Sequence, residues 1–145
     1  MSEVKIRPLK PEEYDDILTL WKRAGLSIRP KGRDSREAIM KQMAEAPDLF
    51  LGAEVSGKLA GIVIASSDGR RGYLNRIAVS PDFRGHGIAQ KLTTAGEDAL
   101  HKRGISVITL QIEDFNKASI RLARKMGYYQ HFDVIYFSKR NSPED

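Results

Sequence analysis

The chain has 145 residues, no cysteine, and 24 lysines and arginines against 19 aspartates and glutamates, which gives a net charge of +5. This length fits a single domain covering 1–145, and the missing cysteines exclude disulfide scaffolds, zinc ribbons and a cysteine nucleophile. Basic and acidic residues are interleaved along the whole chain, which argues against a nucleic-acid-binding surface. No apolar run is long enough to span a membrane, and we expect a cytoplasmic protein.

The first third of the chain predicts one strand and two helices. An alternating stretch at residues 4–9, closed by Pro8, is typical of a short strand. A helix is expected to begin at Pro11 and to end at Gly25, because apolar side chains recur between them at helical spacing. A second amphipathic helix is expected at 35–45, after a basic loop.

The middle of the chain predicts an antiparallel meander. Apolar runs at 49–55, 59–65 and 73–79 are separated by short turns that contain glycine and serine. Turns of this length and composition are typical of hairpins between consecutive strands. We therefore expect three neighbouring antiparallel strands here.

The last third changes to alternating helices and strands. Helices are predicted at 87–102 and 116–126, with a strand at 105–112 between them and a last strand at 128–139. Strand–helix–strand order favours parallel pairing through right-handed crossovers. The expected fold class is α/β: a mixed central sheet with an antiparallel N-terminal meander and parallel strands later, flanked by about four helices.

One loop, between the strand at 73–79 and the following helix, has the composition of a phosphate cradle. It reads Arg84-Gly85-His86-Gly87. Successive backbone N–H groups beside a helix N-terminus attract anions, and the two glycines leave room for one. No Walker pattern is present, and Gln90 stands where a dinucleotide fingerprint needs a small residue. The alternative is a helix cap whose glycines only relieve backbone strain.

Two motifs together resemble the GCN5-related N-acetyltransferases (GNAT). The acetyl-CoA motif of that family, Arg/Gln-x-x-Gly-x-Gly/Ala, is matched by Arg84, Gly87 and Ala89. A second motif is matched by Asn116, Leu122 and Gly127, with Ser119 and Tyr128 at its small and aromatic positions. The chain looks similar to small members near the ribosomal-protein N-acetyltransferases.

This resemblance implies a GNAT fold and a cofactor site. Acetyl-CoA, the acetyl donor, would lie between the strands at 73–79 and 105–112, with the Val79 N–H as an oxyanion donor. The implied cofactor-binding residues are Ile77, Ala78, Val79, Arg84, Gly85, His86, Gly87, Ile88, Ala89, Asn116 and Ser119. An amine acceptor, small molecule or protein, would attack the thioester directly. The resemblance also allows a homodimer. We expect no metal, because His101 and His131 have no companions at ligand spacing.

The residues that would handle protons depart from the family pattern. The positions where relatives carry an acid or a tyrosine hold Asn75, Gln111 and Ala123. Tyr73 and Glu113 are the ionisable groups that remain nearby, so the candidate catalytic set is Tyr73, Asn75 and Glu113. These departures keep a second hypothesis open, a catalytically silent CoA-binding or regulatory module. A basic nucleic-acid-binding domain is a third.

Overall fold

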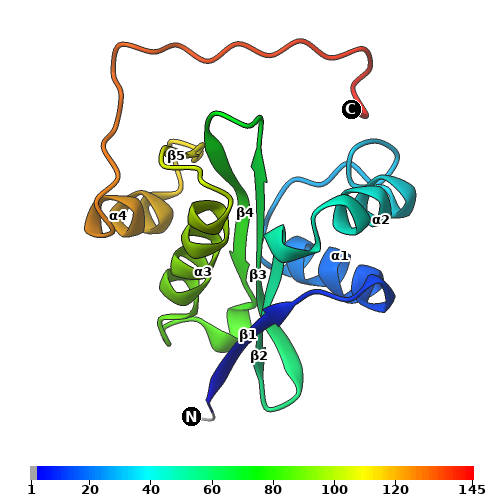
Figure 1. Cartoon of the computed structure of the whole chain (residues 1–145). Helices are drawn as coiled ribbons and strands as arrows, with labels where there is room; N and C mark the ends of the chain where they lie inside the picture. Colours follow the sequence, from blue (N-terminus) through cyan, green and yellow to red (C-terminus); the bar gives the residue numbers. More distant parts are fainter. Residues whose placement is uncertain (1–2) are drawn as a thin grey trace.

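The fold is a single five-stranded sheet with helices on both faces (Figure 1). The computed structural model describes residues 3–145. The strands follow one another in the sheet in chain order: β1 (Val4–Pro8), β2 (Phe50–Val55), β3 (Lys58–Ser67), β4 (Gly72–Val79) and β5 (Ile108–Leu110). Neighbours from β1 to β4 are antiparallel, whereas β4 and β5 are parallel. The predicted mixed α/β sheet is confirmed.

The helices lie close to the predicted ranges. They are α1 (Tyr14–Arg23), α2 (Arg36–Glu45), α3 (Ile88–Lys102) and α4 (Lys117–Lys125), with short 3-10 turns η1 (Pro11–Glu13), η2 (Pro47–Leu49) and η3 (Pro81–Phe83). Ser35 caps α2, since its side chain accepts a hydrogen bond from the Ala38 N–H. Within residues 3–145, no helix has the length and apolarity needed to cross a membrane.

Glycines bring α3 unusually close to the sheet. Figure 1 shows α1 and α2 on one side of the sheet and α3 on the other. A Cβ at Gly96 would lie 2.7 Å from Leu74 Cδ2, and one at Gly61 would lie 2.8 Å from Leu92 Cδ1. Both distances are too short for carbon atoms, so a larger residue at either position would require the leucine side chains between helix and sheet to move. The position of α3, and with it the loop before α3, is therefore fixed by packing.

The pairing between β4 and β5 ends halfway along β4. It covers only three residue pairs, of which the last is Leu74 with Leu110. Beyond it, residues 76–79 of β4 are still paired with β3 but have no strand on their other side. The register also slips at Asn75, because Leu74 and Arg76 pair with consecutive residues of β3. The two strands therefore diverge, and β5 is shorter than the predicted strand at 105–112.

The predicted last strand, 128–139, is wrong for this structure. In the described part of the chain, no strand pairing includes these residues, and they run from α4 across the top of the molecule to the side of α1 and α2 (Figure 1). Their β-branched and aromatic side chains favour a strand locally. A strand also needs a neighbouring backbone, which a local pattern cannot supply, and the single chain offers none along this path.

Candidate functional site

The open half of β4 presents backbone groups toward the gap left by β5. The Ser80 N–H donates to the Ala60 carbonyl at 2.8 Å, which fixes the alternation of hydrogen bonds between β3 and β4. Neighbouring residues along a strand point their N–H groups to opposite sides. The N–H groups of Val79 and Ile77 therefore face away from β3, toward the gap. This is the arrangement that a strand-like ligand or a polarised carbonyl oxygen requires.

The loop before α3 ends in an uncapped helix N-terminus. Gly85 and Gly87 have φ values of +83° and +74°, a left-handed conformation that favours glycine. Gly87 is the N-cap of α3, no side chain caps the helix, and its first turn carries no acidic residue. A Cβ at Gly85 or Gly87 would meet no protein atom within 4 Å. Free N–H groups, a positive dipole end and open space together suit an anionic ligand.

Contacts with α1 hold this loop in place. Arg23, near the end of α1, binds both carboxylate oxygens of Asp82 at 3.0 and 3.1 Å. The side chain of Asp82 hydrogen-bonds Arg23, which lowers the pKa of Asp82 below its ordinary value. Arg84 is exposed, and its guanidinium donates to the Ala24 carbonyl at 3.5 Å, at the edge of hydrogen-bonding range. Arg84 thus lies at the start of the loop with its guanidinium available to an anionic partner.

Two of the predicted cofactor residues offer only their backbone. The side chains of Ile88 and Ala78 are buried in the core, with 2% and 4% of their surface exposed. Ile88 packs toward β3, where its Cγ2 would lie 3.1 Å from a Cβ at Gly61. The exposed His86 lies between the two glycines and has no hydrogen bond in the described residues. At Ile88 and Ala78, only the backbone is available for contact with a ligand.

The start of α4 differs from the start of α3, because its N-cap side chain is occupied. Asn116 Oδ1 accepts a hydrogen bond from the Ser119 N–H at 3.3 Å. The Asn116 amide nitrogen has no partner among residues 3–145 and is free to donate. The chain just after α4 is tied to α3, since the Tyr128 hydroxyl donates to Glu97 Oε2 at 2.5 Å. Burial and this carboxylate raise the pKa of Tyr128.

The candidate proton-handling residues do not form a cluster. The Tyr73 hydroxyl donates to Asp68 at 3.2 Å, and the Asn75 amide donates to the Ser66 hydroxyl at 2.7 Å. Hydrogen bonds from backbone N–H groups lower the pKa of Asp68, so it accepts as a carboxylate. Ser66 is the cross-strand partner of Tyr73, which puts Tyr73 and Asn75 together at one end of β4. Glu113 is exposed beyond β5, with no hydrogen bond to either within residues 3–145.

The structure contains a buried ion pair beside Asn75, between Arg76 and Asp34, that the sequence analysis did not predict. Arg76 donates to Asp34 Oδ2 at 3.0 Å and to the Ser27 carbonyl at 3.0 Å, and its guanidinium lies 4.7 Å from the centre of the Trp21 ring. Burial lowers the pKa of Arg76. Asp34 also accepts from the Arg29 N–H at 2.7 Å. These contacts fasten the loop between α1 and α2 to β4. The one signal in the sequence is a charged residue in the middle of a strand that is otherwise mostly apolar.

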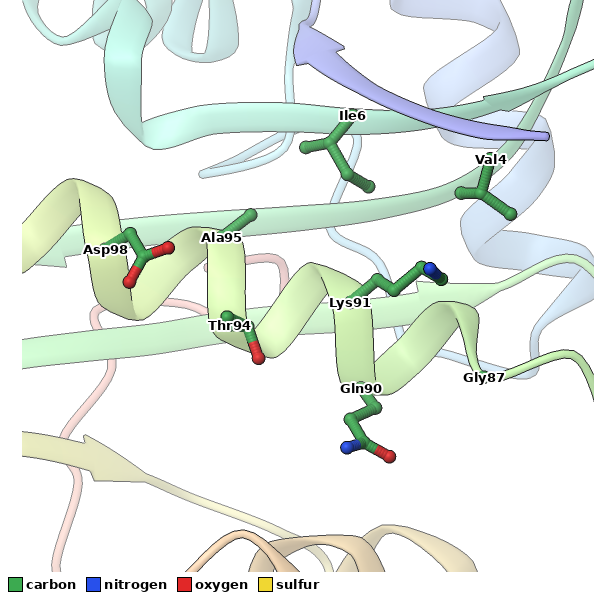
Figure 2. A pocket seen from close by; sticks show the side chains of 8 residues that line it. All are labelled: Val4, Ile6, Gly87, Gln90, Lys91, Thr94, Ala95 and Asp98. Carbon is green, nitrogen blue, oxygen red and sulfur yellow. The ribbon is translucent and has the colours of Figure 1, made fainter.

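A separate groove of about 570 Å³ runs along the flank of α3 that faces β1 (Figure 2). Its lining residues are Val4, Ile6, Gly87, Gln90, Lys91, Thr94, Ala95 and Asp98. It shares only Gly87 with the loop described above. No group of three or more metal-ligating side chains occurs in the described residues.

The comparisons with known proteins agree with this geometry. The family model "Acetyltransferase (GNAT) family" matches residues 14–128. The chain belongs to the GNAT family of acetyltransferases. The matched part runs from the start of α1 to Tyr128 and so includes both sequence motifs, the open half of β4 and the N-termini of α3 and α4. The expected enzyme class, an N-acetyltransferase, is confirmed.

Two relatives and one solved structure show how far the likeness extends. An acetyltransferase of Photorhabdus laumondii is 36% identical over 94% of this chain and 95% of its own length. One of Pectobacterium atrosepticum is 37% identical over 94% and 95%. The structure of the NatC complex bound to Gag peptide and CoA contains a chain that is 27% identical, with a TM-score of 0.77, covering 89% of this chain and 86% of that one.

Proposed function

We propose that this GNAT member transfers an acetyl group directly from acetyl-CoA to a primary amine, with both substrates bound at once and no covalent enzyme intermediate. The observation that carries the proposal is the open half of β4 beside the uncapped N-terminus of α3. A solved relative in the comparison is bound to CoA. The chain has no cysteine to accept the acetyl group. We also propose a cytoplasmic location, as expected from the sequence.

Different parts of the chain would bind different parts of CoA. The N–H groups at residues 84–89 and the Arg84 side chain would hold the pyrophosphate of CoA. The unpaired edge at Ile77, Ala78 and Val79 would bind the pantetheine arm, with Asn116 donating from the other side of the gap and Ser119 beside it. The Val79 N–H, which faces the gap, would stabilise negative charge on the thioester oxygen.

The proposed transfer replaces the C–S bond of the thioester with a C–N bond. The amine nitrogen attacks the thioester carbon, its C–N bond forms, and the C–S bond breaks to release CoA as thiolate. The nitrogen gives up one proton, and the thiolate takes one. Tyr73, Asn75 and Glu113 are the proposed proton-handling residues: Asn75 can only orient water, whereas Tyr73 and Glu113 can exchange a proton. Alignment of the two substrates would supply much of the rate.

Calorimetry and thiol release together test the proposal. We expect isothermal titration to show CoA and acetyl-CoA binding below millimolar concentration, and a panel of amines to release CoA thiol with one of its members. Intact mass spectrometry after incubation with acetyl-CoA alone should show no gain of an acetyl group. Absence of CoA binding would contradict the proposal. Binding without thiol release from any amine would favour the silent module, and a stable acetylated protein would favour a covalent intermediate.

A further inference from the structure

The charges around the buried Asp34 do not balance. Asp34 is 3% exposed and accepts hydrogen bonds from the Arg76 guanidinium at 3.0 Å and from the Arg29 N–H at 2.7 Å. The charged side chains that act on Arg76 are Asp34, Arg33 and Arg29. Three guanidinium groups therefore share one carboxylate, which leaves a surplus of two positive charges. Burial lowers the pKa of Arg76, Asp34 partly offsets this effect, and Arg33 and Arg29 lower the pKa further.

The same place has more buried donors than its own acceptors satisfy. Within residues 3–145, two buried side-chain nitrogen atoms have no hydrogen-bond partner, Trp21 Nε1 and Arg29 Nε. The Trp21 ring lies 4.7 Å from Arg76 Cζ, and the backbone of Arg29 is bonded to Asp34. Buried side-chain donors normally have an acceptor. A surplus of positive charge and a surplus of N–H donors thus occur together, and an anion would answer both.

Arg33 is the arginine of this group that is free to bind a ligand. Its side chain is exposed and makes no hydrogen bond or ion pair with residues 3–145. The nearby Lys31 differs, because its Nζ lies 3.9 Å from the Glu144 carboxylate. A guanidinium binds carboxylates and phosphates through two parallel hydrogen bonds. Arg33 can therefore contact an anion directly, while the two partly buried arginines add positive charge behind it.

The register slip in β4 places this group on the same face as the proposed proton-handling residues. Arg76 pairs with Ile64 and packs on the tryptophan of α1, so its face is the one that α1 and α2 cover (Figure 1). Ser66, two residues from Ile64 on β3, shares that face. Ser66 pairs with Tyr73 and accepts a hydrogen bond from Asn75. The slip thus brings Asn75 and Arg76 to one face, although they are consecutive in the chain.

The spacing along β4 fits a short acceptor. Arg76 and Val79 are three residues apart, which is roughly 10 Å along a strand. The Val79 N–H is the group proposed to hold the thioester oxygen. An amine that reaches the thioester from the face covered by α1 and α2 would therefore have its other end close to the arginines.

We propose that the acceptor is a small primary amine that carries a carboxylate or a phosphate at its other end, bound by Arg33 with Arg29 and Arg76 behind it. This inference rests on the proposed acetyl transfer and adds the charge of the acceptor. The amine nitrogen forms the new C–N bond as the C–S bond breaks, and it loses one proton while the thiolate gains one. The anionic end takes no part in the bond changes and only positions the amine.

The first experiment varies only the charge of the acceptor. With saturating acetyl-CoA, thiol release is measured for ω-amino acids of different chain lengths, for their amides, and for diamines of the same lengths. A parallel series of aminoalkyl phosphates distinguishes phosphate from carboxylate. The best anionic amine should exceed its neutral analogue at least about tenfold in kcat/KM, mainly through a lower KM. Equal values for acids and amides, or a preference for diamines, would overturn the inference and leave the transfer reaction standing.

The second experiment removes the exposed arginine. Arg33→Ala should raise the KM of the anionic amine about fivefold, and Arg33→Glu about twentyfold, because the second change adds repulsion to the lost attraction. The KM of the neutral amide and the affinity for CoA should stay the same. Lys31→Ala is the matched control, since it removes one positive charge from the same loop. An equal effect of Lys31→Ala, or a loss of CoA affinity in the Arg33 variants, would contradict the assignment.

The third experiment detects the anion site without any transfer. Glutarate, which has two carboxylates and no amine, is added to the CoA-saturated protein and followed by saturation-transfer NMR. The wild type and Lys31→Ala should give a signal that Arg33→Glu loses. No signal with the wild type, or the same signal with Arg33→Glu, would overturn the inference. CoA binding without thiol release from any amine would instead contradict the proposed transfer, and glutarate binding would then still report on the arginines.

Discussion

The two helices on either side of the proposed cofactor gap begin in opposite ways. At α3, Gly87 offers no side chain and leaves the first N–H groups of the helix free. At α4, Asn116 uses its own carbonyl oxygen to cap the helix. A helix end without a cap costs stability unless a ligand takes its place. The contrast supports the proposed roles, in which the N-terminus of α3 binds the pyrophosphate and Asn116 at α4 offers only its amide donor.

The largest expected effect comes from filling the space at α3. Gly87→Trp places an indole where a Cβ now meets nothing, and calorimetry should show at least about a hundredfold loss of CoA affinity. The matched control is Gly57→Trp, since Gly57 has a φ of +78° and the same open surroundings. Both variants should lose a similar stability, about 1–3 kcal/mol, from the strained backbone. Equal CoA affinity in the two would mean that the loop is not the cradle.

A smaller effect on CoA affinity is expected from removing the positive charge of Arg84 at the start of the same loop. Arg84→Ala should weaken CoA binding about fivefold, or about 1 kcal/mol, because the charge is exposed and screened by solvent. The loss should shrink at high salt. Arg70→Ala removes the same charge at the opposite end of β4 and should leave the affinity unchanged. An equal loss in both variants would point to the net charge of the protein instead of the loop.

At α4, two substitutions separate capping from binding. Asn116→Ala should lower the free energy of unfolding by about 1 kcal/mol and should also weaken CoA binding. Asn116→Ser keeps a capping oxygen but removes the amide donor, so it should bind CoA as weakly as the alanine variant while unfolding like the wild type. Thermal unfolding and calorimetry on the same samples make the measurement. If the serine variant binds CoA as tightly as the wild type, Asn116 caps the helix and does not contribute to CoA binding.

The smallest effect concerns the link between α3 and the segment that follows α4. Tyr128→Phe removes the hydrogen bond to Glu97 and should cost about 1 kcal/mol at neutral pH. Burial and Glu97 raise the pKa of Tyr128 above its ordinary value of 10.0, so the unfolded chain ionises first. This stabilisation is complete below about pH 10 and is lost as the pH rises through the raised pKa. Denaturation curves should therefore converge for variant and wild type at alkaline pH.

The sequence predicts the parts of the site that depend on local geometry. Gly85 and Gly87 indicate a short loop before a helix, and Asn116 indicates a helix start; both hold in the structure. The α3–sheet contact through Gly96 is less visible, because a glycine inside a helix has several explanations. A local sequence pattern reports the conformational preference of a few neighbouring residues. That preference is enough to predict a structure when the interacting residues are close in the chain.

Long-range partners account for what the sequence does not predict. Arg76 and Asp34 are 42 residues apart, and nothing near either of them indicates that they form a buried pair. The slip of register at Asn75 depends on β3, not on β4 alone. The predicted strand at 128–139 has the right composition and no backbone beside it. In each case the structure is decided by an interaction with residues that are distant in the sequence, which a local pattern does not include.

The position of Trp21 gives the protein a built-in optical reporter. It is the only tryptophan of the chain, it is fully buried, and its indole lies under the Arg76 guanidinium. Arg76 in turn holds Asp34 and the loop between α1 and α2. A movement of that loop would change the surroundings of a single fluorophore. Tryptophan emission therefore offers a label-free signal by which unmodified protein can be screened against amines.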